Sequence, residues 1–270
     1  MSQTKRQLII VLASLLPLLG LMGCEDNLFE GSGDGDSYEG RMEEARSALD
    51  SRDYVRAAAI LRDLDTAYPN TPEVKATLSN ALAGQAGLDT FRILVVLDNL
   101  EEADRYAGSI DVVGLVLGAE DGTITRNQAD EKRALIREAM NLLGQLPQMS
   151  PDQSVQNGLL ALNHAVLVLA QIIMDDRQLD SMKLTKAGVI DIYHWQAALN
   201  PAAASADRLA SLSHDLAIMD KAVQMVLEIT GTPIQENRLA THMSGFLRVL
   251  DRDSDGEIVL QELQKYLNNL

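Results

Sequence analysis

Four of the seven prolines directly follow a residue that favours a helix N-cap, and this feature constrains the fold more than any other. The side chain of an N-cap residue accepts a hydrogen bond from the helix backbone, and a proline in the first helical position loses no intrahelical bond. Two of the pairs extend to capping boxes, with Gln153 and Gln235 as the third helical residue. The pairs are Thr71-Pro72, Ser150-Pro151, Asn200-Pro201 and Thr232-Pro233.

The rest of the composition favours the same fold class. Aromatic residues make up 4% of the chain, and Ala, Leu, Glu and Gln fill the windows between these helix starts. We therefore predict an all-α fold, built as helical hairpins or a helical bundle. The expected helices span 38–51, 54–67, 72–85, 89–106, 128–145, 151–175, 188–198, 201–229, 233–250 and 259–269.

The first 24 residues have the features of an export signal. Lys5 and Arg6 precede an apolar run that ends in Leu21-Met22-Gly23-Cys24. This ending resembles the lipobox of bacterial lipoproteins, which implies cleavage before Cys24 and acyl chains on its thiol and on the new amino terminus. The alternative is an ordinary signal peptide with a chance cysteine. We expect residues 1–23 to be the signal peptide.

Residues 24–37 are expected to form a lipidated flexible tether, because glycine, serine and acidic residues dominate them.

The formal net charge of the whole chain is -16, and such a surface repels nucleic-acid phosphates and anionic lipid headgroups. Nucleic acid is therefore excluded as a partner. The acyl chains on Cys24 would hold the protein at the membrane of the bacterial cell envelope, facing the periplasm; inner and outer membrane remain alternatives.

A helical repeat pattern occupies residues 38–72. It resembles one tetratricopeptide repeat, in which small residues let two helices approach, an aromatic residue begins the second helix and a proline follows it. Arg41 and Leu64 depart from that family's pattern, and a generic helical bundle is the alternative. The matching residues are Ala45, Tyr54, Ala57, Leu61 and Pro69. The resemblance implies a scaffold of stacked helix pairs, with Ala45 and Ala57 near the helix crossing.

Residues 153–174 contain no charged side chain. A membrane span and a helix buried in the centre of a bundle both have this composition. Because amide and imidazole groups interrupt the segment, we interpret it as a buried core helix, and His164 as a core histidine.

The twelve residues DRDSDGEIVLQE, Asp251 to Glu262, match the EF-hand calcium loop at every template position. This segment resembles an EF-hand, which implies that Asp251, Asp253, Asp255 and Glu262 bind Ca²⁺ through side chains and Glu257 through its carbonyl. Hard Ca²⁺ takes about six to eight oxygen ligands. The apolar faces of the flanking helices are expected at Phe246, Leu247, Leu250, Leu263, Leu267 and Leu270.

EF-hands usually occur in pairs, and the apolar residue at the eighth position, here Ile258, contacts the partner loop. The segment 117–128 keeps Asp121, Gly122 and Ile124 of the pattern but lacks the ligands. It is either a non-binding partner loop or a turn that resembles one by chance.

No grouping of nucleophile, acid and base stands out, since the four histidines are scattered and the one cysteine is assigned to acylation. We therefore expect that the protein is not an enzyme.

The predicted domains are the signal peptide (1–23), the tether (24–37), a helical body (38–232) and the EF-hand unit (233–270). The predicted function is a lipid-anchored scaffold for an envelope protein partner; the alternatives are an accessory or solute-capturing component of an envelope transport system and an envelope hydrolase.

We predict that Cys24 is the acylated first residue of the mature protein. Mass spectrometry of the protein purified from its native membrane should show a lipid-modified amino-terminal cysteine. An intact Met1, or an unmodified Cys24, would contradict the prediction.

Overall fold

The computed structural model describes residues 37–88, 123–183, 198–231 and 233–268. The signal segment 1–23, Cys24, the tether up to residue 36, the expected helix at 89–106 and nearly all of that at 188–198 lie outside the described residues. The chain divides into two compact units, Met1–Glu43 and Glu44–Leu270. Of the first unit, the structure describes only Ser37 and the beginning of one helix.

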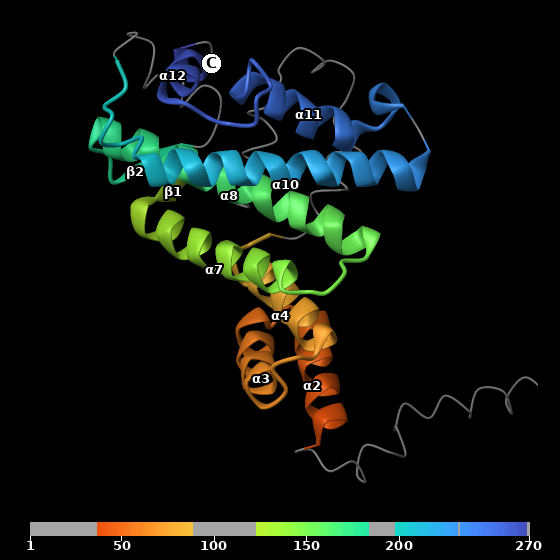
Figure 1. Ribbon diagram of the computed structural model, residues 1–270. Coiled ribbons are helices and arrows are strands. Elements are labelled where there is room, and N and C mark those ends of the chain that lie inside the picture. Colours follow the sequence, from red (N-terminus) through yellow and green to blue (C-terminus); the bar gives the residue numbers. More distant parts are fainter. Residues whose placement is uncertain (1–36, 89–122, 184–197, 232, 269–270) are drawn as a thin grey trace, which may run out of the picture. The chain divides into compact units, whose positions relative to one another are not determined.

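The described residues are predominantly α-helical, which confirms the predicted fold class (Figure 1). The only strands among them are two of three residues each, paired antiparallel with Ile124 opposite Met182. The elements are α2 (Tyr38–Asp50), α3 (Tyr54–Ala67), α4 (Pro72–Gln85), β1 (Thr123–Thr125), α7 (Arg126–Gly144), α8 (Pro151–Arg177), β2 (Ser181–Lys183), α10 (Ala206–Thr230), the 3-10 turn η2 (Ile234–Glu236), α11 (Arg238–Leu250) and α12 (Leu260–Asn268).

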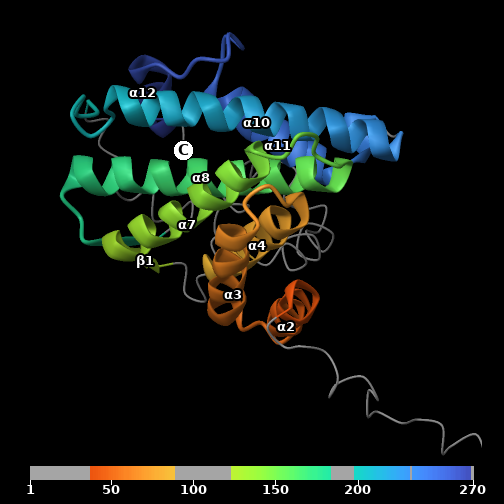
Figure 2. The same ribbon diagram turned by 60° about the horizontal axis from the view of Figure 1, so that its bottom comes forward.

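Helix α8 forms the core of the unit Glu44–Leu270. Every residue from Asn157 to Met174 is buried, and α7 and α10 pack against it from different sides (Figure 2). Helix α8 is long and apolar enough to cross a membrane, but its most apolar stretch of 18 residues is 100% buried inside the protein. The uncharged segment is therefore a core helix in this fold, as its polar residues indicated.

Small residues permit the closest helix contacts. A Cβ atom added to Gly158 of α8 would lie 2.1 Å from the Cβ of Ala222 in α10, and one added to Gly84 of α4 would lie 2.3 Å from the Tyr54 ring of α3. Ala45 and Ala57, which were expected near a helix crossing, are both fully buried. The membership of this region in the tetratricopeptide family stays a prediction.

Two of the four proline-based helix starts are confirmed. Pro72 and Pro151 are the first residues of α4 and α8, and Ser150 forms the expected capping box with Gln153. A second capping box in the described residues, between Thr125 and Gln128, begins α7. The sequence contains the same Thr-x-x-Gln motif at 125–128, but no proline follows Thr125.

The helix start predicted at Asn200-Pro201 is wrong. The Asn200 side chain accepts a hydrogen bond from the Ala202 N–H at 3.0 Å, and this local bond favours a turn over a helix. The Arg208 side chain donates to the Ala203 carbonyl at 2.7 Å, which further stabilises the turn. Helix α10 begins at Ala206 instead.

The helix start predicted at Pro233 is also wrong. Pro233 precedes the short turn η2, and Asn237 is the N-cap of α11, where its side chain accepts from the Ala240 N–H at 3.0 Å. The Thr241 hydroxyl donates to the Ile234 carbonyl, which joins the turn to the helix. Asn237 thus satisfies one of the free backbone N–H groups in the first turn of α11, which begins at Arg238 rather than at Pro233.

We predict that Gly158→Ala destabilises the protein by roughly 1–3 kcal/mol, because the new methyl group overpacks the contact with Ala222. The control is Gly245→Ala in α11, where nothing lies within 4 Å of the added Cβ and the change should stabilise by about 0.5–1 kcal/mol. Urea unfolding of both variants measures the difference. Shifts of the same sign would contradict the packing argument.

Candidate functional site

The loop between α11 and α12 holds the strongest candidate site. Asp251, Asp253 and Asp255 each offer a carboxylate oxygen, and these oxygens all lie within 4.8 Å of one another. They are the three aspartates that the sequence predicts as ligands. The structure therefore brings half-buried Asp251 together with the exposed pair into one acidic group.

Backbone turns hold these carboxylates in place. Gly256 has a φ of 83°, in the left-handed region that costs a glycine little. Its N–H donates to Asp251 Oδ2 at 2.9 Å, and the Glu257 N–H donates to Asp255 Oδ1 at 2.8 Å. One oxygen of Asp251 and one of Asp255 are thereby fixed, which leaves the other oxygen of each available to a ligand.

The second oxygen of Asp251 supplies the observation that points to a cation. Asp251 Oδ1 is buried and has no hydrogen-bond partner in the structure. A buried carboxylate oxygen without a partner is costly, and an oxygen-binding cation would satisfy it. Because the neighbouring donors are also carboxylate oxygens, the residues present fit a hard cation such as Ca²⁺.

Glu262 lies in the first turn of α12 and is only 7% exposed. Its Oε1 accepts from the Arg252 N–H at 3.1 Å, and its Oε2 accepts from the Val259 N–H at 3.4 Å. The carboxylate thus links the two ends of the loop, but Glu262 is not a member of the acidic group that Asp251, Asp253 and Asp255 form. The Glu257 side chain is exposed, and its assigned role through the backbone carbonyl stays a prediction.

The flanking helices bury the faces that the sequence predicts. Leu247 is half-buried, and Leu270 lies outside the described residues. The fully buried members of the predicted faces are Phe246, Leu250, Leu263 and Leu267.

One contact of the loop could not be found by sequence reasoning. The Ile258 N–H donates to Ser213 Oγ of α10 at 2.8 Å, although 45 positions separate the two residues. Ile258 itself is 3% exposed. No local motif marks Ser213, so only the packing of the loop against α10 identifies it.

The candidate partner loop at 117–128 has a different neighbour. In its described part, Ile124 lies in β1 opposite Met182 of β2. The structure therefore pairs its central apolar residue with the segment after α8, and the loop Asp251–Glu262 contacts α10 instead.

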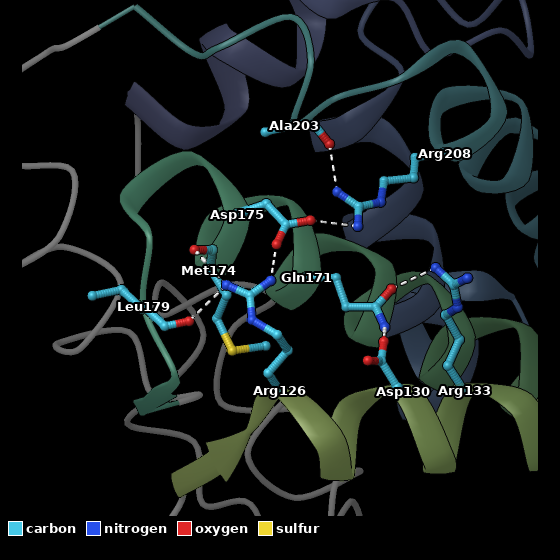
Figure 3. A network of polar contacts seen from close by, with 9 residues as sticks. All are labelled: Arg126, Asp130, Arg133, Gln171, Met174, Asp175, Leu179, Ala203 and Arg208. Atoms are coloured by element: carbon cyan, nitrogen blue, oxygen red, sulfur yellow. Dashed lines mark hydrogen bonds and ion pairs between the residues drawn. The ribbon is translucent and has the colours of Figure 1, made fainter.

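A second group of polar side chains joins α7, α8 and the start of α10 (Figure 3). Asp175 of α8 forms ion pairs with Arg126 and, at 2.6 Å, with Arg208, while Arg126 also donates to the Leu179 carbonyl at 2.8 Å. Because its charges are paired with one another and with backbone carbonyls, this group stabilises the helix ends rather than offering a free binding surface.

The other half of the same network lies on Gln171 of α8. The Gln171 amide donates to Asp130 and accepts from Arg133, both on α7 (Figure 3). Burial lowers the pKa of the Arg133 guanidinium, and the nearby Arg137 and Arg208 lower it further. Asp130 and Arg133 thus provide hydrogen bonds for the buried Gln171 amide, which the apolar side chains around α8 could not provide.

His164 and Asp215 form a buried polar pair between α8 and α10. His164 Nδ1 lies 2.7 Å from Asp215 Oδ2, and the two residues are 3% and 1% exposed. Burial raises the pKa of the Asp215 carboxyl, although the hydrogen bond and charge of His164 act in the opposite direction. Such burial closes the pair to a substrate, so it serves packing, as predicted for His164.

Comparison of the chain with protein-family models, characterised proteins and solved structures finds no match.

We predict that Asp215 makes stability fall as pH rises. The pKa of its carboxyl is raised in the folded state, so between the ordinary pKa and the raised one the unfolded chain loses this proton while the folded protein keeps it, and rising pH favours unfolding until the folded carboxyl also ionises. Asp215→Asn removes this titration and keeps a hydrogen-bonding group beside His164. The free energy of unfolding, measured from below the ordinary Asp pKa of about 3.9 up to neutral pH, should increasingly favour the variant. A difference that stays constant with pH would contradict this.

Proposed function

We propose that this protein is a lipid-anchored, periplasm-facing helical scaffold of a bacterial cell envelope, which binds a protein partner and carries one Ca²⁺ in the loop Asp251–Glu262. The observation that carries the metal proposal is the buried, unpartnered Asp251 Oδ1 beside Asp253 and Asp255. The match of the whole loop to the EF-hand template supports it independently.

Five residues would hold the ion. Asp251, Asp253, Asp255 and Glu262 supply side-chain oxygens, and Glu257 supplies its backbone carbonyl. Ca²⁺ would neutralise the mutual repulsion of the carboxylates, which face only Arg252 as a cation within the loop. The ion would thereby hold α11 and α12 together as a structural staple.

The environment favours a structural role over a switch. EF-hand sites of extracellular modules have dissociation constants on the order of 10⁻⁴–10⁻³ M, and calcium outside the cytosol is not kept scarce. A weak site would therefore remain substantially occupied in the periplasm.

The helical body supports the scaffold role. It consists of packed helices around α8, and the His164–Asp215 and Arg126–Asp175 pairs join these helices to one another. The anchor would be Cys24, and residues 24–37 would hold the helical body away from the membrane. The partner would be another protein of the envelope.

We predict that the full mature chain, in detergent and stripped of metal, binds one Ca²⁺ in a calorimetric titration. Glu262→Gln should weaken this binding sharply, because it removes charge from the predicted bidentate ligand. Glu257→Gln is the matched control and should change little, because its ligand is the backbone carbonyl. Mg²⁺ should compete poorly, since it demands compact octahedral geometry.

The absence of calcium-dependent heat and of any melting shift at millimolar calcium would overturn the metal site.

The same two variants test the scaffold role as baits for capture from solubilised native membranes. An envelope protein should be enriched by wild type and Glu257→Gln, and less by Glu262→Gln. Recovery of no envelope protein above background would count against the scaffold.

A further inference from the structure

The hydrogen bond between the calcium loop and α10 has a defined direction. The Ser213 hydroxyl donates its one proton to the Leu209 carbonyl at 3.0 Å, one turn earlier in the same helix. Its oxygen is therefore free to accept, and it accepts from the Ile258 N–H at 2.8 Å. The α10 backbone thus fixes the orientation of the hydroxyl, and the hydroxyl fixes the N–H.

The Ser213 hydroxyl replaces water as the hydrogen-bond acceptor of the Ile258 N–H. Ile258 is 3% exposed, so an Ile258 N–H without Ser213 would lose its hydration without gaining a hydrogen bond. The bond contributes to the position of the loop as well as to its stability.

The N–H of Ile258 and the carbonyl of Glu257 belong to the same peptide group. A peptide group is planar and trans, so its N–H and C=O point in opposite directions. When Ser213 holds the N–H toward α10, the Glu257 carbonyl is directed away from α10. The orientation of a proposed metal ligand is thereby set by a residue outside the loop.

We propose that Ser213 is a positioning residue of the calcium site, which directs the Glu257 carbonyl toward the ion. This inference rests on the proposed calcium binding. Ser213 does not touch the ion; it acts through the peptide group between Glu257 and Ile258. Ser213 contacts the backbone of Ile258, whereas Ile124 of the candidate partner loop is paired with Met182.

The test compares Ser213→Thr with Ser213→Val in the full mature chain. The two side chains have nearly the same shape, but only threonine keeps a hydroxyl, which can also bond the carbonyl four residues earlier. Calorimetry should show calcium affinity about tenfold weaker for valine than for threonine, equal to about 1.4 kcal/mol. Ser211→Ala on another face of α10 is the control and should bind calcium as wild type does.

A spectroscopic readout separates positioning from general loosening. In wild type, calcium should shift the ¹³C resonance of the Glu257 carbonyl together with the ¹⁵N resonance of Ile258. In Ser213→Val these two shifts should shrink, while the calcium-induced shifts at Asp253 and Asp255 remain. Ser213→Thr should restore both. Equal losses at all loop positions would mean that Ser213 only stabilises the fold, and would overturn the inference.

The outcomes distinguish the two proposals. If wild type takes up no calcium, the metal site itself is wrong. If wild type binds and valine matches threonine, the metal site stands and the role of Ser213 is refuted. Should Ser213→Val not fold, Ser213→Ala removes the hydroxyl without adding volume, and the same comparison with threonine decides.

Discussion

Burial of the apolar helix α8 against α7 and α10 is the interaction on which the rest of Glu44–Leu270 depends. Every residue from Asn157 to Met174 is buried, and each large aliphatic side chain among them contributes about 1.5–3 kcal/mol of transfer free energy. A helix that is apolar all round must be enclosed by other elements. Gly158 allows α10 to approach closely, because a methyl group there would collide with Ala222.

Polar groups on α8 specify how its neighbours lie. His164 binds Asp215 of α10, Gln171 binds two residues of α7, and Asp175 binds an arginine from each side. Leaving His164 or Gln171 unpaired in the core would cost more than a typical hydrogen bond contributes, so a rotated or shifted helix would be penalised. Apolar burial therefore encloses α8, and the polar pairs select one arrangement of the enclosing helices.

Helix α10 connects this core to the acidic loop Asp251–Glu262. Asp215 on one face contacts His164 of α8, and Ser213, two residues earlier and so on a different face, contacts Ile258 of the loop. The loop is thus attached to a helix whose position the core already fixes. That attachment gives a rigid reference for the peptide group between Glu257 and Ile258, which is what a ligand supplied by a backbone carbonyl requires.

The sequence by itself determined the helical class, the core helix, which was predicted at 151–175, and the helix starts at Pro72 and Pro151, because capping and composition act within a few residues. It also placed Asp251, Asp253 and Asp255 together, since the spacing of a tight loop fixes which side chains converge. It failed at Asn200-Pro201 and Pro233, where local turns competed with the helix. Only the tertiary structure decided the partners of His164, Asp175 and Ile258, because hydrogen bonds between residues 33 to 51 positions apart leave no local pattern.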